Sequence, residues 1–490
     1  MRTEKVERLT KTTVLIVILI FLGLRFVYLE ADFPSGITWS GVLYTDEGWY
    51  SNGAASYFIS GNWLIEGDFN TIVNVPIFQL LQSLTFKLIG LSLFSARITP
   101  VVISVFMVLF IYLLVRKYTD KLTALVAASL LSTNYIVYAY SRLAILDLPM
   151  ISFVLLSILV VLSFPKANHF IVIGASSVIF CFSVLTKTNA LFALPVYLYA
   201  TSLRQTNMRK RLSYCGWALV FVIILLSIYY LLINSSFSVD YKYFASLNIA
   251  SRISWNPLSI VRNFIRAVWH GVQLEPVLYP LTLTVAPICM FISPNFRKNN
   301  LVVLSMIWIV SYLCVLAVYS YQPPRYILPL SVPIVILFSL SSISLYRKLQ
   351  PRLSSYLPMI VGALIIIMNG FGILQYLQKP NFSFLNMAHD IQHTIEASTQ
   401  HDQDVVLLGD IANSIGLVTG ISSINATQGT RDLAWKLSFY EPEYYVSVGI
   451  EEIPINTIEE YFDVEEISTY NVFNNYYKGK AVHFYRITKR

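Results

Sequence analysis

The sequence predicts a polytopic α-helical membrane protein with about eleven spans, juxtamembrane helices in its first outer loop, and a small C-terminal α/β soluble domain. Of its 490 residues, 56% are hydrophobic and 13% are charged, whereas soluble domains contain about 25% charged residues. Apolar runs recur between residues 12 and 375, and they reach the roughly 17–25 residues that cross a bilayer. The rest is polar, acidic and turn-rich, so we divide the chain into a transmembrane domain, 1–379, and a soluble domain, 380–490.

Eleven apolar segments are the predicted spans. They are 12–29, 97–115, 122–140, 148–164, 169–186, 188–203, 212–233, 277–293, 301–320, 326–345 and 356–376.

A further apolar segment, 73–94, is ambiguous, and positive charge decides how we interpret it. If it does not cross, all basic clusters fall on one side of the membrane, as the positive-inside rule requires. These clusters are Arg2/Lys5/Arg8/Lys11, Arg116/Lys117/Lys121, Lys166, Arg204/Arg209/Lys210/Arg211, Arg297/Lys298 and Arg347/Lys348/Arg352. We therefore expect 73–94 to be a juxtamembrane or re-entrant helix. The N-terminus is then cytoplasmic, and the C-terminal domain is extracytoplasmic. We expect the plasma (inner) membrane of a prokaryote, and the alternative is a eukaryotic protein whose site faces the ER lumen.

The net charge of +8 does not indicate a nucleic-acid partner, because Lys and Arg concentrate in short loops between apolar segments. The four cysteines all fall in apolar segments, so no disulfide framework is expected in the soluble domain. The basic N-terminal stretch precedes an apolar run without a small-residue cleavage site, and we interpret that run as an uncleaved first span.

The first outer loop carries acids and no Lys or Arg between residues 30 and 72. We expect an amphipathic surface helix from about 47 to 60 that begins at Thr45/Asp46 and stops at Gly61. Asp46 can be an N-cap and Glu47 a first-turn acid favoured by the helix dipole. The alternative is that both carboxylates have a chemical function at the membrane surface.

Three further polar sites are expected at the same face. Asp147 follows Arg142 in the turn "YSRLAILDLPM", Lys187 lies in "LTKTNALFALP", and Arg325 precedes Tyr326 in "YQPPRYILPL". A helix end explains Asp147 without function, and snorkelling to the interface explains the two cations. Cations at an outer face nevertheless run against the positive-inside bias, so an anionic lipid head group is the alternative explanation.

Four ordered motifs carry a resemblance to a known family. They are "DEGWY" (46–50), "SRLAILD" (141–147), "LTKTN" (185–189) and "PPRYILPL" (323–330). In this order they resemble the GT-C superfamily of integral membrane glycosyltransferases. The most similar branch contains the protein O-mannosyltransferases and the aminoarabinose transferases of lipid A. The stretch "NVPIFQLLQSLTFKLIGLSLFSARI" resembles the juxtamembrane segment of that branch, with Val75-Pro76 where paired prolines or Lys-Pro are common. The resemblance covers roughly residues 10–345.

The resemblance implies a reaction and a set of roles. Such enzymes move a sugar from a polyprenyl phosphate, dolichyl or undecaprenyl, to an acceptor hydroxyl on a protein, lipid or glycan, with inversion. Asp46 would be the general base, and Glu47 and Asp147 would orient the substrates. The metal requirement stays open: Asp46 and Asp147 are the candidate ligands of a divalent cation, Mg²⁺ or Mn²⁺.

Positively charged and aromatic residues complete the predicted site. Those expected at the donor phosphate are Lys187, Arg325 and Arg142, because a departing lipid phosphate gains negative charge. Those expected at the acceptor or head group are His270, Arg266 and Tyr326. For His270 and Arg266, in the long outer loop 234–275, a solvated amphipathic helix is the alternative.

The C-terminal domain should alternate helices and strands. Helices are expected at 386–398 and 411–420, and strands at 404–410, 444–450 and 481–487.

Two other function classes compete with the transferase. A polytopic transporter or lipid flippase would carry ionisable groups near the bilayer midplane, often in repeated halves, whereas here they lie at the ends of spans and no repeat is visible. A non-catalytic membrane scaffold would leave Asp46, Asp147, Lys187 and Arg325 without a purpose.

Overall fold

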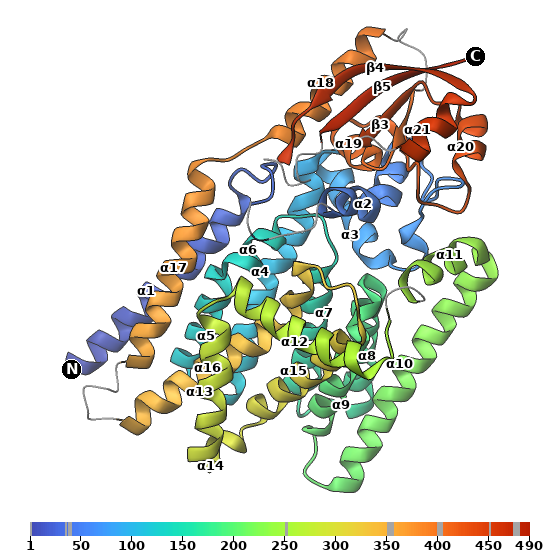
Figure 1. Cartoon of the computed structure of the whole chain (residues 1–490). Coiled ribbons are helices and arrows are strands. Elements are labelled where there is room, and N and C mark those ends of the chain that lie inside the picture. The colour runs from blue at the N-terminus through green and yellow to red at the C-terminus, as the bar shows by residue number, and fades with distance from the viewer. Residues whose placement is uncertain are drawn as a thin grey trace.

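The computed structural model describes residues 2–34, 37, 42–249, 253–349, 357–398, 405–449, 452–473 and 481–490. Long helices form a bundle, and a mixed sheet with its own helices covers one end of that bundle (Figure 1). The C-terminal end of the chain lies in the sheet (Figure 1). One continuous apolar core runs from the bundle, through α2, into one face of this sheet.

The bundle and its connections contain helices of very different length. The α-helices are α1 (Arg2–Gly23), α2 (Val42–Ser60), α3 (Pro76–Ile89), α4 (Leu93–Tyr118), α5 (Lys121–Thr133), α6 (Tyr135–Ser141), α7 (Asp147–Ser163), α8 (His169–Thr186), α9 (Leu194–Ser202), α10 (Met208–Ser236), α11 (Ser238–Ile249), α12 (Pro257–Leu274), α13 (Leu278–Ile292), α14 (Pro294–Arg297), α15 (Asn300–Val318), α16 (Leu328–Leu349) and α17 (Leu357–Gln378). The 3-10 turns are η1 (Leu24–Phe26), η2 (Thr71–Val73), η3 (Thr188–Ala193) and η4 (Pro324–Ile327).

Within the described residues, six helices are long and apolar enough to cross a membrane, or up to eight if each bent pair is one span. The six are Leu93–Tyr118, His169–Thr186, Met208–Ser236, Asn300–Val318, Pro324–Lys348 and Ile360–Ser398. The bent pairs are α5 with α6, at 59°, and α12 with α13, at 113°. Two shorter apolar helices, Thr12–Phe26 and Asp147–Ser163, match two further predicted spans. The prediction of a polytopic helical membrane protein is confirmed.

The predicted span 188–203 is not one α-helix. The chain forms η3 and then α9, with Pro195 in the first turn of α9. Proline has no N–H to donate but fits the first turn of a helix, so it favours a new helix start at this point.

The ambiguous segment 73–94 folds as the 14-residue helix α3, followed directly by α4. Fourteen residues rise about 21 Å, which is less than the roughly 30 Å of a hydrocarbon core. The buried Gln79 and Gln82 side chains bond Thr71 and Ser51, so one face of α3 is fixed against α2 and the loop that follows α2. This geometry favours the juxtamembrane interpretation of 73–94.

Helix α2 begins earlier than predicted. It starts at Val42, so Asp46 lies inside the helix and the predicted N-cap at Thr45/Asp46 is wrong. The apolar triplet Val42-Leu43-Tyr44 continues a helix as well as it continues a loop, and the sequence pattern therefore placed the boundary too late. The predicted end is confirmed: Gly61 has φ +80, and its N–H bonds the carbonyl of Tyr57 at 3.0 Å.

The C-terminal part carries a five-stranded mixed sheet in the order β2-β1-β3-β5-β4. Its strands are β1 (Val406–Gly409), β2 (Ser422–Ile424), β3 (Tyr444–Val448), β4 (Phe462–Tyr470) and β5 (Val482–Lys489). β1 pairs in parallel with β2 and β3, whereas β5 pairs antiparallel with β3 and β4. The helices are α18 (Ser383–Ser398), α19 (Ala412–Thr419), α20 (Leu433–Tyr440) and α21 (Glu452–Glu459). The predicted small α/β domain is present.

Candidate functional site

A charged cluster is assembled from four parts of the chain. Asp46 comes from α2, Asp147 begins α7, Lys187 caps the C-terminus of α8, and Arg325 lies in η4. All four residues are nine-tenths or more buried. The sequence predicted these four residues as one site, and the structure brings them together.

The four groups alternate in charge. Arg325 Nη1 is ion-paired with the Asp46 carboxylate, and Arg325 Nε lies 3.9 Å from Asp147 Oδ2. Lys187 Nζ donates to Asp147 Oδ1 at 2.6 Å. Buried charges persist only when they are paired, so this chain of pairs keeps both cations in place. Among the described residues, Arg325 Nε donates no hydrogen bond.

A cavity of about 370 Å³ opens beside the cluster. Among the described residues, its charged lining groups are Asp46, Lys187 and Arg325, two cations and one anion. Asp147 does not line the cavity, but it accepts a hydrogen bond from Lys187 Nζ. Aromatic side chains supply much of the remaining wall: Trp49, Tyr50, Phe69, Phe244, Tyr321 and Tyr326. The cavity therefore suits an anion joined to a group with apolar faces.

Tyr326 links the two cations. Lys187 Nζ lies 4.9 Å and Arg325 Cζ lies 5.9 Å from the centroid of its ring. A ring face attracts cations at such distances. The structure thus places Tyr326 in the cavity wall beside both cations, and its predicted contact with an acceptor or head group stays a prediction.

Burial changes the proton affinity of two cavity groups. It raises the pKa of the Asp46 carboxyl, and the neighbouring Arg325 and Lys187 cations oppose that shift. Burial lowers the pKa of the Lys187 ammonium, and Asp147 opposes that shift. Each ionised group therefore depends on its partner.

Glu47 does not face this cavity. Adjacent residues on a helix point about 100° apart, and Glu47 forms a two-pronged pair with Arg97 of α4, at 2.8 and 2.6 Å. Its Oε1 also accepts from the backbone N–H of Ala144 at 2.7 Å. We therefore correct its predicted substrate-orienting role: Glu47 fixes the start of α2 to α4 and to the turn before Asp147.

Arg142 also has a different place from the predicted one. Its guanidinium donates to the carbonyls of Arg25, Val27 and Tyr28, in the segment that follows α1. It stacks on Tyr138 and Tyr376 and does not line the cavity. We therefore correct the predicted phosphate contact. Arg142 instead fixes the position of the segment that follows α1.

His270 and Arg266 both lie on α12, and neither lines the cavity. Arg266 donates to the carbonyl of Ser320, just before the segment that carries Arg325. The role of this pair at an acceptor or head group stays a prediction.

The cavity contains residues to which the sequence analysis assigned no role. Thr188 and Asn189 follow Lys187, and Gln428 reaches it from the C-terminal domain. Gln428 Oε1 accepts from Tyr243 Oη at 3.0 Å. Arg97 was also missed, although "SARI" lies within the quoted juxtamembrane stretch. The one sequence feature that could have pointed to Arg97 is a positive charge inside an apolar segment. Such a charge alone is compatible with a functional site and with a structural ion pair.

The prediction that Asp46 and Asp147 bind a divalent cation depends on which donor groups surround them. The described residues contain no group of three or more His, Cys, Asp or Glu side chains that could hold a metal ion. Asp46 and Asp147 are two carboxylates, and each is already paired with a cation. A divalent cation would therefore have to displace Arg325 or Lys187 from these carboxylates, and the metal requirement stays a prediction.

A family model described as dolichyl-phosphate-mannose-protein mannosyltransferase matches residues 74–230. A curated protein from Aquifex aeolicus (strain VF5), described as uncharacterized, is 26% identical over 192 residues. That match covers 38% of this chain and 38% of the relative.

Solved structures of similar fold cover far more of the chain. ArnT from Cupriavidus metallidurans bound to undecaprenyl phosphate matches with a TM-score of 0.63 at 13% identity, over 96% of this chain and 98% of ArnT. The archaeal oligosaccharyltransferase AglB from Archaeoglobus fulgidus, in complex with an inhibitory peptide and a dolichol-phosphate, matches with a TM-score of 0.52 at 12% identity. That match covers 90% of this chain and 70% of AglB. The predicted resemblance to the GT-C superfamily, in its mannosyltransferase and ArnT-like branch, is confirmed.

Proposed function

We propose that this GT-C-fold protein transfers a sugar from a polyprenyl phosphate to an acceptor hydroxyl at the extracytoplasmic face of the membrane. The observation that carries the proposal is the cavity whose wall presents Lys187 and Arg325 beside the carboxylate of Asp46. Two buried cations can bind a phosphate, and a buried carboxylate next to them can accept a proton. ArnT and AglB, which share the fold, were solved with undecaprenyl phosphate and dolichol-phosphate.

The proposed reaction is a direct displacement. The acceptor oxygen attacks the anomeric carbon while its proton passes to the Asp46 carboxylate. The bond from that carbon to the phosphate oxygen breaks, and the phosphate leaves with the electron pair. General base catalysis of this kind contributes about 10²–10⁴-fold, and the single displacement inverts the anomeric carbon.

The cations act on the leaving group. The departing lipid phosphate gains one negative charge, which Arg325 and Lys187 would neutralise in a site with little water. The planar guanidinium of Arg325 can contact two phosphate oxygens, whereas Lys187 acts as a single charge. No general acid is needed, because a phosphate is already a weak base.

Donor binding also explains why Asp46 is paired with Arg325 before the reaction. A phosphate that contacts Arg325 competes with Asp46 for the same guanidinium, and the carboxylate is then released toward the acceptor. Asp147 keeps its bond to Lys187 throughout, since it lies outside the cavity wall. We therefore assign Asp147 a positioning role.

The test is sugar transfer by purified full-length protein. It would receive a panel of labelled polyprenyl-phosphate sugars, with membrane extract as acceptor. We expect at least one donor to be consumed, with release of free lipid phosphate and labelled product. Failure of every donor to be bound or consumed would contradict the proposal and favour a transporter or lipid flippase.

A further inference from the structure

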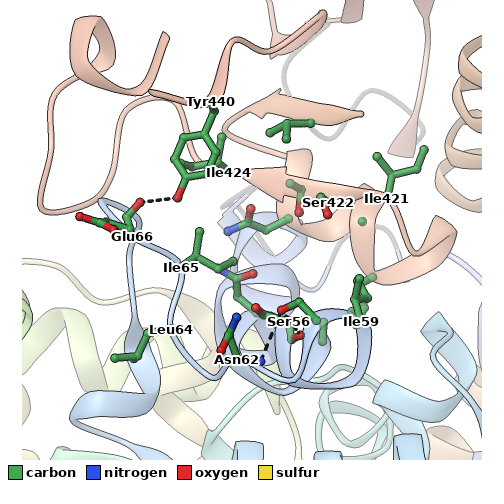
Figure 2. A pocket seen from close by; sticks show the side chains of 18 residues that line it. Ser56, Ile59, Asn62, Leu64, Ile65, Glu66, Ile421, Ser422, Ile424 and Tyr440 are labelled. Carbon is green, nitrogen blue, oxygen red and sulfur yellow. Dashed lines mark hydrogen bonds between the residues drawn. The ribbon is translucent and has the colours of Figure 1, made fainter. Parts of the chain in front are cut away.

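A second cavity, of about 380 Å³, lies where α2 and the loop after it meet the C-terminal domain. Figure 2 shows Ser56 and Ile59 of α2 on one side, and Ile421, Ser422 and Tyr440 of the C-terminal domain on the other. No residue in the described part of the chain lines both this cavity and the one beside Asp46.

The lining of this second cavity is polar but almost uncharged. Serine hydroxyls and asparagine amides occur beside aliphatic side chains, and Glu66 is the only charged side chain among the described residues that line the cavity. Hydroxyl and amide groups both donate and accept hydrogen bonds. Ligand sites of about 300–1,000 Å³ typically combine such groups with apolar walls, so the lining matches a neutral ligand rich in hydroxyl groups.

The shape of the cavity is set before any ligand binds. Tyr440 Oη donates to the carbonyl of Glu66 at 2.6 Å, which ties the C-terminal domain to the loop after α2 (Figure 2). Asn70 accepts from Ile65 N and donates to Ile65 O, both at 2.9 Å, and so holds the same loop from within. Preformed walls lower the entropic cost of binding.

One acceptor group in the lining has no partner among the described residues. Asn413 is 4% exposed, and its Oδ1 accepts no hydrogen bond, while its Nδ2 contacts Asp68 at 3.4 Å. A buried unpaired acceptor costs about 1–3 kcal/mol, and buried polar groups normally have a partner. Because this oxygen is itself closed to solvent, a ligand hydroxyl would reach it only if the Asn413 side chain turned toward the cavity.

We propose that this second cavity binds a carbohydrate portion of the acceptor, so that the acceptor is a glycan or a glycan-bearing molecule. Asn52, which lines it, is six residues from Asp46 along α2, or about 9 Å along the helix axis. A glycan of a few sugar units can span that distance and present its terminal hydroxyl to Asp46. This assignment rests on the proposed transferase function.

The test measures equilibrium binding to purified full-length protein by saturation-transfer NMR. The probes are three neutral disaccharides (mannobiose, cellobiose and lactose) and one neutral Ser/Thr-containing pentapeptide. Ser56→Trp and Ser422→Trp fill the cavity from opposite walls, and Ser422 is an exposed residue whose change is compatible with folding. Ser398→Trp, at the exposed end of α18, is the matched control.

We expect saturable binding of at least one disaccharide by wild type, Ser398→Trp and Asp46→Asn, and at least tenfold weaker binding by both cavity variants. Absence of disaccharide binding, unchanged binding by Ser422→Trp, or binding of the pentapeptide alone would overturn the proposal. The two hypotheses fail separately. Disaccharide binding without any sugar transfer contradicts only the transferase, and transfer with unchanged disaccharide binding by both variants contradicts only the carbohydrate cavity.

Discussion

At the residue scale, the pair Glu47–Arg97 joins α2 to α4 inside the protein, with both side chains at most 2% exposed. Arg97 also donates to the carbonyls of Leu29 and Ala31, at 3.0 and 2.8 Å. One arginine thus fixes the first outer segment, α2 and α4 together.

Glu47→Ala should lower the free energy of unfolding by about 3–5 kcal/mol, because it leaves a buried guanidinium without its counter-charge. The measurement is the thermal midpoint of the purified protein in detergent. The double variant Glu47→Leu with Arg97→Met removes both charges and should lose less stability than Glu47→Ala. If the double variant were the less stable one, the pair would not have the role described here.

From the burial of Asp46 we predict that the rate of sugar transfer depends on pH. Burial raises its pKa above the ordinary value, and the nearby cations limit that rise. A base must be ionised, so activity should fall as the pH drops through this raised pKa, which lies above the usual carboxyl range.

The measurement is the pH profile of transfer for wild type and Lys187→Met. Lys187→Met removes one of the cations that lower the pKa of Asp46, so its acid limb should move to higher pH. The same shift should not occur in Lys298→Met, an exposed control. An acid limb that stays unmoved in Lys187→Met would contradict the electrostatic link between the two residues.

At the element scale, α19 of the C-terminal domain packs against α2 next to Asp46, the proposed base. Gly48 lies two residues after Asp46, and its N–H donates to Ser414 Oγ at 3.1 Å. A Cβ at position 48 would lie 2.4 Å from the Ser414 nitrogen and 2.6 Å from the Asn413 carbonyl carbon. Only glycine allows this close approach of the two helices.

Gly48→Ala should therefore push α2 away from α19 and move Asp46 with it. A displacement near 1 Å can cost about 10²-fold in rate, so we expect at least a tenfold loss of transfer. Gly216→Ala is the control, because nothing lies within 4 Å of its added Cβ. Equal activity of the two variants would show that α19 does not position α2.

The sequence predicted long apolar elements well and short or polar ones poorly. The predicted span 169–186 and the helix α8 have the same bounds, because a long apolar run with an Asn168 cap leaves few alternatives. Strand β4 was missed, since its acidic residues suit an edge strand whose burial is only partial. β2 was missed because three residues carry almost no periodicity.

The candidate site was likewise predicted only in part: its residues were identified, but the directions of their side chains were not. Motif order selected Asp46, Asp147, Lys187 and Arg325, which meet in space. The direction of each side chain could not be predicted from composition, because it depends on how α2 is rotated against α4. That rotation separates Asp46, in the cavity wall, from Glu47, in the pair with Arg97.

At the scale of the whole molecule, the basic clusters and the cavity beside Asp46 should lie on opposite sides of the membrane. The prediction is checked in intact cells with a membrane-impermeant maleimide, in a chain whose four free cysteines are changed to serine. Ser398→Cys, in the C-terminal domain, should react from outside.

Lys298→Cys, in one basic cluster, should react at least tenfold less until the membrane is permeabilised. Equal labelling of the two positions in intact cells, or labelling of Lys298→Cys alone, would reverse or abolish the proposed orientation.

The most direct test of the central claim compares wild type with Asp46→Asn in single-turnover transfer from a labelled polyprenyl-phosphate sugar. Asn keeps the size of the side chain but cannot accept the acceptor proton. We predict that Asp46→Asn still binds the donor, through Lys187 and Arg325, and transfers sugar at least 10²-fold more slowly. Transfer by Asp46→Asn at the wild-type rate would contradict the assignment of Asp46 as the base.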